Sequence, residues 1–437
     1  MAMISVIRTK RSIVKPSEKT PSTTLPLSPI DRLAVLRCNA RTLHVFKHGP
    51  EAASLIRNAL SIALVPYYPL AGRIVESDDE NSEIQIECSG DGVWFVEASA
   101  LGTTLDSVDY FDDVESIPYD DLLPDDDHVP QSECFDPLVQ MQVTQFGCGG
   151  FVIGLIFCHS ICDGLGAAQF LNAIGEIARG LQKPSINPIW HRNFFPPSPP
   201  SLQEQDPNKQ TPLPKLPLAP PPILPQYHLQ HTNIDIPIHQ IHLLKQQFHH
   251  KTGKYCSAFE IVASAFWRNR TKAINLLDPN TEVKLVFFAN CRHLLDPPLP
   301  RGFYGNCFFP VTITTPCGSL TRSSIIEVIE LIQEAKGRLP YEFGKYLKGG
   351  GEEDDPFAPP LTYTTLFISE WGRLGFNDVD YKWGPPVHVV PIQGSSIIPV
   401  GIVGSMPLPK KGIRLMTWCV EEAHRGPFVD EMVSWTK

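Results

Sequence analysis

Residues 151–166 read FVIGLIFCHSICDGLG and contain, in order, an apolar run, a histidine, an aspartate and the start of a helical pattern. The first seven residues carry no charge, which is typical of a buried strand. His159 follows the run, Asp163 comes four residues later, and from Leu165 small and apolar residues recur at helical spacing. His159 is therefore predicted to lie where a buried strand passes through a turn into a helix. Rigid elements on both sides of such a turn can hold a catalytic group while it faces a cleft.

The His-x-x-x-Asp spacing is by itself a weak signal, because the chain contains it twice. His231 and Asp235, in HTNID, have the same separation, and apolar residues alternate with polar ones there before a proline. That pattern predicts an ordinary half-exposed strand that leads into a helix. His159 differs in its context, which is an apolar strand before it and an Asp-Gly pair and a small-residue helix after it.

The composition indicates a soluble globular protein with more than one domain. The 437 residues are enough for two domains of ordinary size, and 42% of them are hydrophobic while 19% are charged. The net charge is −10 and no long basic run is present, which argues against nucleic acid as a partner. No run reaches transmembrane length and the N-terminus lacks the apolar core of a secretory signal, so we expect no membrane insertion.

The cysteines and the acidic residues exclude further classes of site. The 11 cysteines include no CxxC pair and lie largely in or beside apolar runs, which predicts reduced thiols and a cytoplasmic protein. We expect this protein to be a monomer. The acidic stretch 106–127 has no histidine or cysteine at ligand spacing, so we expect a solvated loop there and no metal site.

Strands and helices intermix in both halves of the chain. In the first half the patterns predict strands at 41–48 and 138–145, a helix at 51–64, and a hairpin of strands 83–88 and 93–98 around SGDG. In the second half they predict strands at 231–236, 284–290, 363–368, 387–392 and 414–420, and helices at 241–250, 257–274 and 323–339. Because strands and helices intermix in both halves and no Rossmann fingerprint is present, we predict an α/β fold with large mixed sheets.

A proline-rich segment, residues 196–225, separates the two halves and is predicted to be an extended linker that crosses between domains. We therefore expect one domain at 1–195 and a second at 226–437. A disordered insertion without architectural meaning is the alternative that the composition leaves open.

Several motifs are similar to those of one known family, and the similarity covers essentially the whole chain. The chain resembles the plant BAHD acyl-CoA-dependent acyltransferases in HSICDG at 159–164, YYPLAGR at 67–73, YGN at 304–306 and DYKWG at 380–384.

The last of these motifs departs from the family pattern, which normally reads Asp-Phe-Gly-Trp-Gly. Asp380, Trp383 and Gly384 match it. Tyr381 keeps an aromatic ring in place of Phe, whereas Lys382 replaces a conformationally free glycine with a charged residue.

The resemblance implies two domains of similar size, each with a large mixed sheet flanked by helices as in chloramphenicol acetyltransferase, and a channel at their interface. Acyl-CoA would enter as co-substrate from one face and a small-molecule alcohol or amine from the other, with no permanently bound cofactor. His159 would be the general base that deprotonates the acceptor as it attacks the thioester. Asp163 and Asp380 also belong to the catalytic motifs, but the family implies architectural roles for both, with Asp163 paired to Arg292.

Other positions carry over from the family by their motifs. Ser369 and Trp371, in SEWGR, match its Thr-x-Trp segment, which faces the channel, and Ser369 is a candidate donor to the oxyanion. Lys254 and Ser257 fall where the family often contacts the phosphates of CoA. The residues expected to give structural support are Arg292, Gly164, Trp383 and Gly384.

A covalent route is a rival mechanism, because Cys158 and Cys162 flank His159 and a cysteine can carry an acyl group. Cys158 belongs to the apolar strand and is predicted to be buried and unreactive. The family transfers the acyl group directly, so the resemblance favours direct transfer here.

The substrates are predicted from longer segments. Residues 36–49, 287–312 and 410–422 look most like the hydroxycinnamoyl-CoA transferases that acylate monolignols, which favours a p-coumaroyl or feruloyl donor and an alcohol acceptor. Residues 148–170 also resemble benzoyl- and acetyl-transferring members that act on benzyl alcohol or diterpenoids, so these donors, and an amine acceptor, stay open. A catalytically degenerate scaffold protein is the third alternative, motivated by the altered DYKWG motif.

Overall fold

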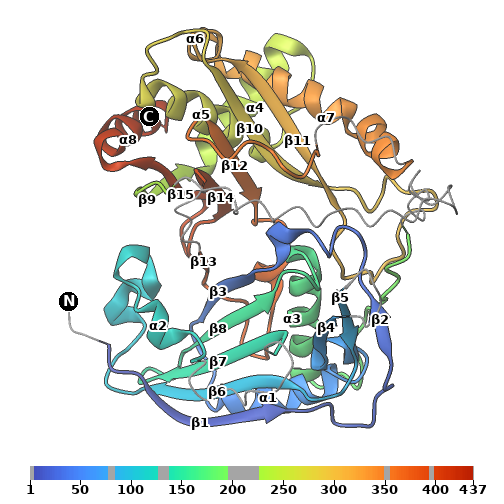
Figure 1. The fold of residues 1–437 in the computed structure, drawn as a ribbon. Helices are drawn as coiled ribbons and strands as arrows, with labels where there is room; N and C mark the ends of the chain where they lie inside the picture. The colour runs from blue at the N-terminus through green and yellow to red at the C-terminus, as the bar shows by residue number, and fades with distance from the viewer. Residues whose placement is uncertain are drawn as a thin grey trace, which may run out of the picture.

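The computed structural model describes residues 4–76, 84–125, 137–194, 226–348, 355–392 and 398–436. Two sheet-rich domains lie one above the other (Figure 1). The predicted α/β fold is confirmed, because each domain contains a six-stranded sheet that combines parallel and antiparallel pairs. The proline-rich segment 196–225 lies outside the described residues, so the linker and the domain limits stay predictions.

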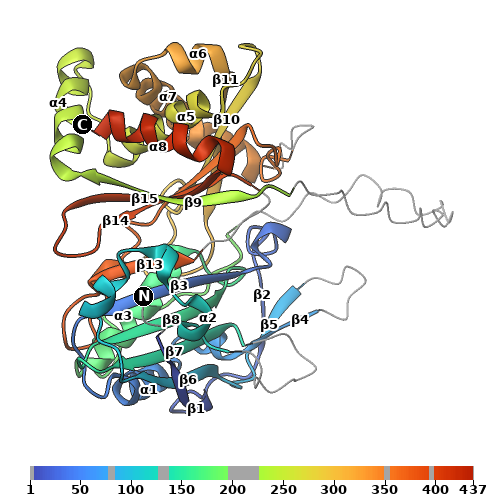
Figure 2. The ribbon, with the colours of Figure 1, turned by 90° about the vertical axis from the view of Figure 1, so that its left-hand side faces the viewer.

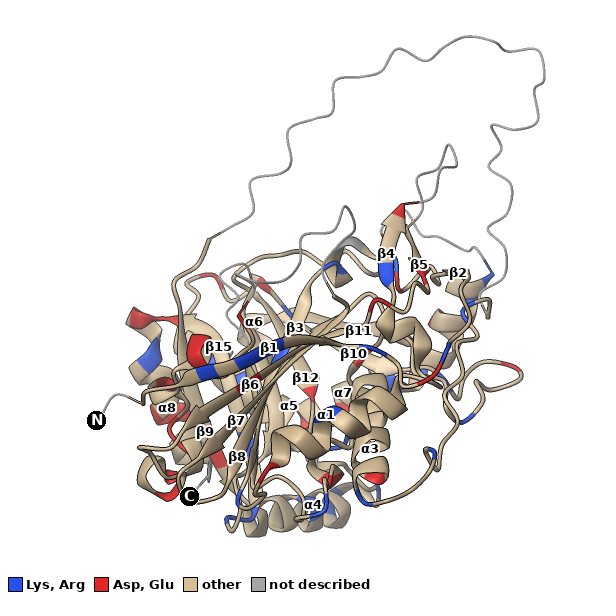
Figure 3. Ribbon diagram, turned by 90° about the horizontal axis from the view of Figure 1, so that it is seen from below, with Lys and Arg blue, Asp and Glu red and all other residues tan. Residues whose placement is uncertain are grey.

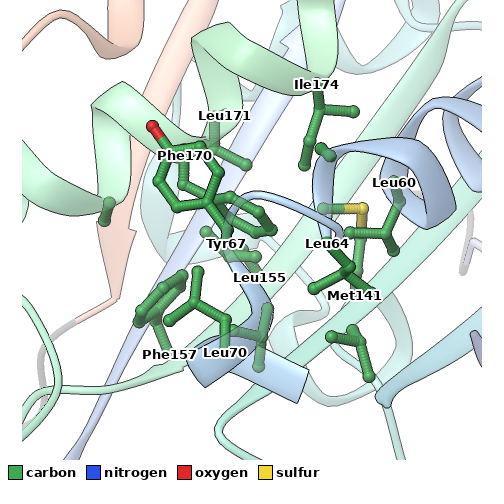
Figure 4. Close-up of a cluster of buried hydrophobic side chains, with 14 of the residues drawn as sticks. Leu60, Leu64, Tyr67, Leu70, Met141, Leu155, Phe157, Phe170, Leu171 and Ile174 are labelled. Carbon is green, nitrogen blue, oxygen red and sulfur yellow. The ribbon is translucent and has the colours of Figure 1, made fainter. Parts of the chain in front are cut away.

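The sheet of the first domain has the strand order β1-β6-β7-β8-β3-β13. Buried side chains from α1, α3 and the sheet, among them Leu60, Met141, Leu155, Phe170 and Ile174, pack together in its core (Figure 4). This core holds the strand before His159 and the helix after it. The elements are β1 (Ile7–Val14), β3 (Asn39–Phe46), α1 (Ala52–Ala63), β6 (Val93–Ala100), β7 (Val139–Phe146), β8 (Phe151–Cys158), α3 (Gly164–Ala178) and β13 (His388–Ile392).

The sheet of the second domain has the order β11-β10-β12-β14-β15-β9, and its helices lie mainly on the side away from the first domain (Figure 2). The HTNID segment lies in β9 and leads into α4, as its alternation predicted. None of the described helices is long and apolar enough to span a bilayer. The elements are β9 (Leu229–Pro237), α4 (Ile238–Thr252), α5 (Ala258–Ile274), β10 (Glu282–Asn290), β11 (Phe308–Pro316), α6 (Cys317–Arg322), α7 (Ile325–Leu347), β12 (Thr365–Glu370), β14 (Val400–Ser405), β15 (Gly412–Glu421) and α8 (Glu422–Thr436).

One strand of the C-terminal half belongs to the first sheet. β13 pairs antiparallel with β3, and Val390 lies opposite Leu43. The chain then returns to the second sheet through β14. The chain therefore passes from the second domain into the first before β13 and back again after it. The DYKWG motif lies just before β13 in the sequence.

The predicted hairpin of residues 83–88 and 93–98 is wrong. Its first strand is β5 (Ile84–Glu87), which pairs with β4 (Arg73–Glu76) and β2 (Thr24–Pro26) in a separate three-stranded sheet. The second strand, β6, pairs with β1 and β7. The SGDG segment therefore carries the chain from one sheet to another, and the choice of strand partner is set by long-range packing that a local turn sequence does not reveal.

Most acidic residues in the described part of the stretch, 106–125, are exposed, as expected for a solvated loop, but the segment also forms short helices and two of its carboxylates are half-buried and paired. Asp112 forms ion pairs with Arg414 at 2.8 Å and Lys410 at 2.6 Å, both from the second domain. Asp125 pairs at 2.6 Å with Arg11 of β1, a strand that carries several basic residues at the edge of the first sheet (Figure 3). The short helices of the stretch are η3 (Asp106–Phe111), η4 (Val114–Ser116) and α2 (Tyr119–Leu122).

Candidate active site

The turn between β8 and α3 holds His159 by its backbone. Its N–H donates to the carbonyl oxygen of Cys38 at 2.9 Å, and its carbonyl oxygen accepts from Nδ2 of Asn306 at 2.9 Å. The side chain is half-buried, and its Nδ1 is buried with no hydrogen-bond partner among the described residues. The histidine is thus fixed from both domains, since Cys38 comes from the first half of the chain and Asn306 from the second.

Asp163 pairs with Arg292, the partner that the family resemblance implied, and it also caps α3. Its carboxylate accepts from the backbone N–H of Gly166 at 3.0 Å and from Nη2 of Arg292 at 2.8 Å. Arg292 also donates to the carbonyl oxygen of Gly305 at 2.6 Å. Gly164 begins α3, and Leu374 of the loop after β12 packs against it. The carboxylate of Asp163 therefore binds both the first turn of α3 and the Arg292 guanidinium.

Asp380 organises the loop of the DYKWG motif. Its Oδ1 accepts from the backbone N–H groups of Lys382 and Gly384, both at 2.8 Å. Arg179, at the end of α3, donates to its carbonyl oxygen and lies 3.9 Å from its carboxylate. Trp383 packs edge-on against Phe151 of β8, with ring centroids 6.0 Å apart. The loop of the DYKWG motif thus supports two elements: Trp383 contacts β8 and Asp380 contacts the end of α3. Gly384 holds the Asp380 carboxylate in place.

The first departure from the family motif places a charged residue in a strained backbone conformation. Lys382 has φ of 105°, a region that favours glycine. Lys382→Gly is expected to raise the free energy of unfolding by about 1 kcal/mol, because relief of backbone strain outweighs the added freedom of the unfolded chain. Denaturant unfolding measures it. Gly384→Ala is the matched control, since Gly384 has φ of 94° with open space around it, and this variant should be less stable. If Lys382→Gly is less stable than the parent protein, the backbone of Lys382 is not strained.

The second departure buries a hydroxyl. Tyr381 is 1% exposed and packs against Phe46, and its hydroxyl has no hydrogen-bond partner in the described parts of the chain. Tyr381→Phe is expected to raise the free energy of unfolding by about 1 kcal/mol, because an unsatisfied buried polar group is removed. Thermal unfolding checks it. Tyr67→Phe is the control and should be destabilising, because the Tyr67 hydroxyl accepts from Gln169 at 3.0 Å. If both variants lose the same stability, the Tyr381 hydroxyl cannot be an unsatisfied polar group.

The segment after β12 reaches the start of α3. Ser369 is exposed at the end of β12, and Trp371 is half-buried with its ring 5.5 Å from that of Phe376. Nδ2 of Asn172, in α3, donates to the carbonyl oxygen of Gly375 at 3.0 Å. Ser369 and Trp371 therefore lie on the segment that joins the end of β12 to the helix behind His159.

A buried polar pair that the sequence patterns did not reveal lies in the same neighbourhood. Nε2 of His44 lies 2.9 Å from Oγ1 of Thr42, and the His44 ring contacts Phe376 edge-on at 5.4 Å. Burial lowers the pKa of His44 to about 3, so its imidazole is neutral in ordinary buffers. The only local signal for the Thr42–His44 pair is the polar positions within the alternating segment RTLHVF.

Lys254 and Ser257 lie in the turn between α4 and α5 of the second domain. Ser257 caps α5, because its Oγ accepts from the N–H of Glu260 at 3.2 Å while Glu260 accepts from the N–H of Ser257 at 2.9 Å. Lys254 is exposed. The side chain of Lys254 is thus accessible to solvent, whereas the oxygen of the Ser257 hydroxyl accepts a hydrogen bond in the cap of α5.

The two cysteines beside His159 are poor nucleophiles. Burial raises the pKa of Cys158 and raises that of Cys162 well above its usual value. The thiolate is the nucleophilic form, so burial keeps both residues in the unreactive thiol form. This argues against the covalent route.

Comparisons with known proteins place the chain in one family. The chain matches the Transferase family over residues 4–416. It is 42% identical to Acyl transferase 4 of Oryza sativa subsp. japonica over an alignment of 455 residues that covers 99% of each chain. It is 36% identical to the myricetin 3-O-glucosyl 1,2-rhamnoside 6'-O-caffeoyltransferase AT2 of Crocosmia x crocosmiiflora, again over 99% of each chain.

A solved structure has the same fold. Vinorine synthase superimposes with a TM-score of 0.70 at 20% identity, over 99% of this chain and 100% of that one. The family match and the curated relatives together show an enzyme that uses an acyl-CoA thioester as co-substrate. The chain belongs to the Transferase family of BAHD acyl-CoA-dependent acyltransferases.

Proposed function

We propose that this acyltransferase moves a hydroxycinnamoyl group, p-coumaroyl or feruloyl, from CoA to an alcohol such as a monolignol. The observation that carries the chemistry is the placement of His159 on a turn held by both domains. The donor is supported by the segments that resemble hydroxycinnamoyl transferases and by a relative named as a caffeoyltransferase, since caffeoyl is a hydroxycinnamoyl group.

In the proposed mechanism Nε2 of His159 accepts the acceptor's hydroxyl proton, because Nδ1 is buried. The acceptor oxygen bonds to the thioester carbonyl carbon, and the carbonyl electron pair moves onto its oxygen. The hydroxyl of Ser369 donates to that oxyanion. When the tetrahedral intermediate collapses, the carbon–sulfur bond breaks and the CoA sulfur takes the proton back from the imidazolium. Asp163 and Asp380 act by holding the structure of the site, and Trp371 lines the channel. Lys254 meets the CoA phosphates, and Ser257, whose Oγ accepts from Glu260, donates its O–H to them.

A substrate grid tests this proposal. Thiol release by the purified protein is measured with p-coumaroyl-, feruloyl-, benzoyl- and acetyl-CoA against coniferyl alcohol, benzyl alcohol, shikimate, spermidine and a diterpenoid polyol. We expect the highest kcat/KM with a hydroxycinnamoyl donor and coniferyl alcohol. A clear preference for benzoyl- or acetyl-CoA would replace the proposed donor with the alternative that residues 148–170 support.

The scaffold alternative makes a different prediction in the same experiment. A degenerate member would release no CoA and would show no heat of acyl-CoA binding in calorimetry. Retention of the Asp163–Arg292 pair around the His159 turn favours an active enzyme. We also propose that the protein is a cytoplasmic monomer, and the ten free cysteines among the described residues are consistent with a reducing compartment.

A further inference from the structure

A buried polar cluster lies directly behind the His159 turn. Its members are almost inaccessible to solvent: Asp31 and Asn306 are 0% exposed, Ser28 is 1% exposed and Arg192 is 3% exposed. They come from three distant parts of the chain. Ser28 and Asp31 belong to the LSPIDRL segment, Arg192 lies near the end of the first half, and Asn306 belongs to the YGN motif of the second.

The carboxylate of Asp31 is the centre of this cluster. Its Oδ2 accepts from the N–H of Ser28 at 3.0 Å and from Oγ of Ser28 at 2.7 Å. Its Oδ1 accepts from Nδ2 of Asn306 at 2.7 Å and from the N–H of Asn306 at 3.2 Å. Nη1 of Arg192 lies 3.4 Å from the carboxylate. A buried carboxylate is costly unless it is paired and hydrogen-bonded, and this one is both.

Two of the residues that bind Asp31 also donate hydrogen bonds to the turn that carries His159. The Asn306 amide that binds Asp31 also donates to the carbonyl oxygen of His159 at 2.9 Å. Nη2 of Arg192 donates to the carbonyl oxygen of Ile161 at 2.7 Å. The carboxylate therefore orients two donors, and each donor holds one backbone carbonyl of the turn that presents the imidazole.

The space around Arg192 is also fitted to this arrangement. Its guanidinium lies 4.2 Å from the centre of the Trp190 ring. A Cβ atom at Gly305 would lie 1.1 Å from Nη1 of Arg192, so only glycine allows the guanidinium to occupy this place. The backbone of the YGN motif and the arginine thus fit against each other directly behind the turn.

We propose that Asp31 is a positioning residue for the general base, acting through Asn306 and Arg192 on the carbonyl groups of His159 and Ile161. The proposal rests on the role of His159 in the proposed function. Proton transfer to a histidine requires hydrogen-bond reach to the acceptor hydroxyl. A misplacement of about 1 Å can cost about a hundredfold in rate, so loosening the turn lowers kcat while CoA binding, which depends on other residues, is retained.

Asp31→Asn is the principal test, because it keeps the shape of the side chain and removes its charge. With the full-length protein and p-coumaroyl-CoA, we expect kcat to fall about tenfold to a hundredfold while KM for the acyl-CoA changes less than about threefold. Asp235→Asn is the matched control, since Asp235 also binds a buried arginine, Arg414, at 2.7 Å but lies on β9. Its kcat should stay within about twofold of the parent value.

A spectroscopic readout separates positioning from stability. In NMR spectra of histidine-labelled protein, the His159 signal is assigned as the one missing from His159→Ala. Asp31→Asn should shift or broaden this signal, and Asp235→Asn should leave it unchanged. If Asp31→Asn lowers only the thermal midpoint, with kcat and the His159 signal unchanged, the positioning role is overturned.

If Asp31→Asn does not fold, a variant with a smaller structural effect tests the positioning role of Asp31. Ser28→Ala removes one donor to the carboxylate and retains the backbone donor, so about a threefold fall in kcat with a smaller change in the His159 signal is expected. An unchanged kcat and signal would overturn the proposal. His159→Ala in the same assay keeps the two ideas apart. If it retains turnover, the general-base assignment fails; if it is inactive while the Asp31 and Ser28 variants behave like the parent, only the positioning role fails.

Discussion

Replacing His159 by alanine is expected to lower kcat for CoA release by about two to four orders of magnitude, the contribution typical of a positioned general base. The acceptor hydroxyl is a weak nucleophile, and without the imidazole its proton must go to water during attack. The fold should be unaffected, because the hydrogen bonds of His159 to Cys38 and Asn306 are made by its backbone. Thiol release at saturating substrate, with circular dichroism and thermal unfolding as folding checks, measures the effect.

The chain supplies a matched control in its second His-x-x-x-Asp segment. His231 lies on β9, 3.6 Å from Glu115 and with its ring 4.8 Å from that of Trp418, away from the β8–α3 turn. His231→Ala should keep kcat within about twofold of the parent value, because no reacting group depends on it. Equal activity losses in both variants would indicate a general effect on folding and would remove the support for His159 as the base.

The strand, turn and helix around His159 could be predicted from sequence because their signals are local. The uncharged run at 151–157 and the helical spacing from Leu165 correspond to β8 (Phe151–Cys158) and α3 (Gly164–Ala178). Local patterns did not predict which strands pair. The exchange of β13 into the first sheet and the separation of β5 from β6 depend on packing between distant segments.

The partners of the site residues could not be predicted from spacing either. Asp163 and Arg292 are 129 residues apart, and their pairing was expected only from the family resemblance. Asp31 was visible as one aspartate in LSPIDRL, but its sequence position gave no sign that it is fully buried beside Asn306. A polar residue in a short loop is usually exposed, so such a cluster becomes apparent only when the chain is folded.

Several elements of the second domain were absent from the predictions, and for two of them the physical reason is clear in the sequence. β14 (Val400–Ser405) is rich in glycine, which is uncommon in strands, and α8 (Glu422–Thr436) contains Pro427, which is uncommon within helices. Both elements pack against well-formed neighbours, β14 beside β12 and β15, and α8 against α5. Tertiary contacts therefore override the weak local preferences of these segments.

Asp163→Ala is expected to lower the free energy of unfolding by about 3–5 kcal/mol, because it removes both a mostly buried ion pair and the N-cap of α3. The side chains of Arg292 and Asp163 are only 15% and 12% exposed, so the guanidinium would be left without its counter-charge in a poorly solvated place. Denaturant unfolding measures the loss. Ser324→Ala is the control for the cap alone: Ser324 caps α7 without an ion pair, and its loss should cost about 1 kcal/mol.

The same variant decides whether Asp163 is architectural or catalytic. If Asp163 has an architectural role, Asp163→Ala and Arg292→Ala should lose similar amounts of unfolding free energy. The double variant should be little less stable than either single variant, because each substitution already breaks the pair. Activity should then fall in parallel in all three, since the turn that carries His159 loses its anchor. If Asp163 instead met the substrate, Asp163→Ala would lose activity with unchanged stability and Arg292→Ala would remain active. The geometry favours the first outcome, because the carboxylate is held in the cap of α3 by Gly166 at 3.0 Å and in the ion pair by Arg292 at 2.8 Å.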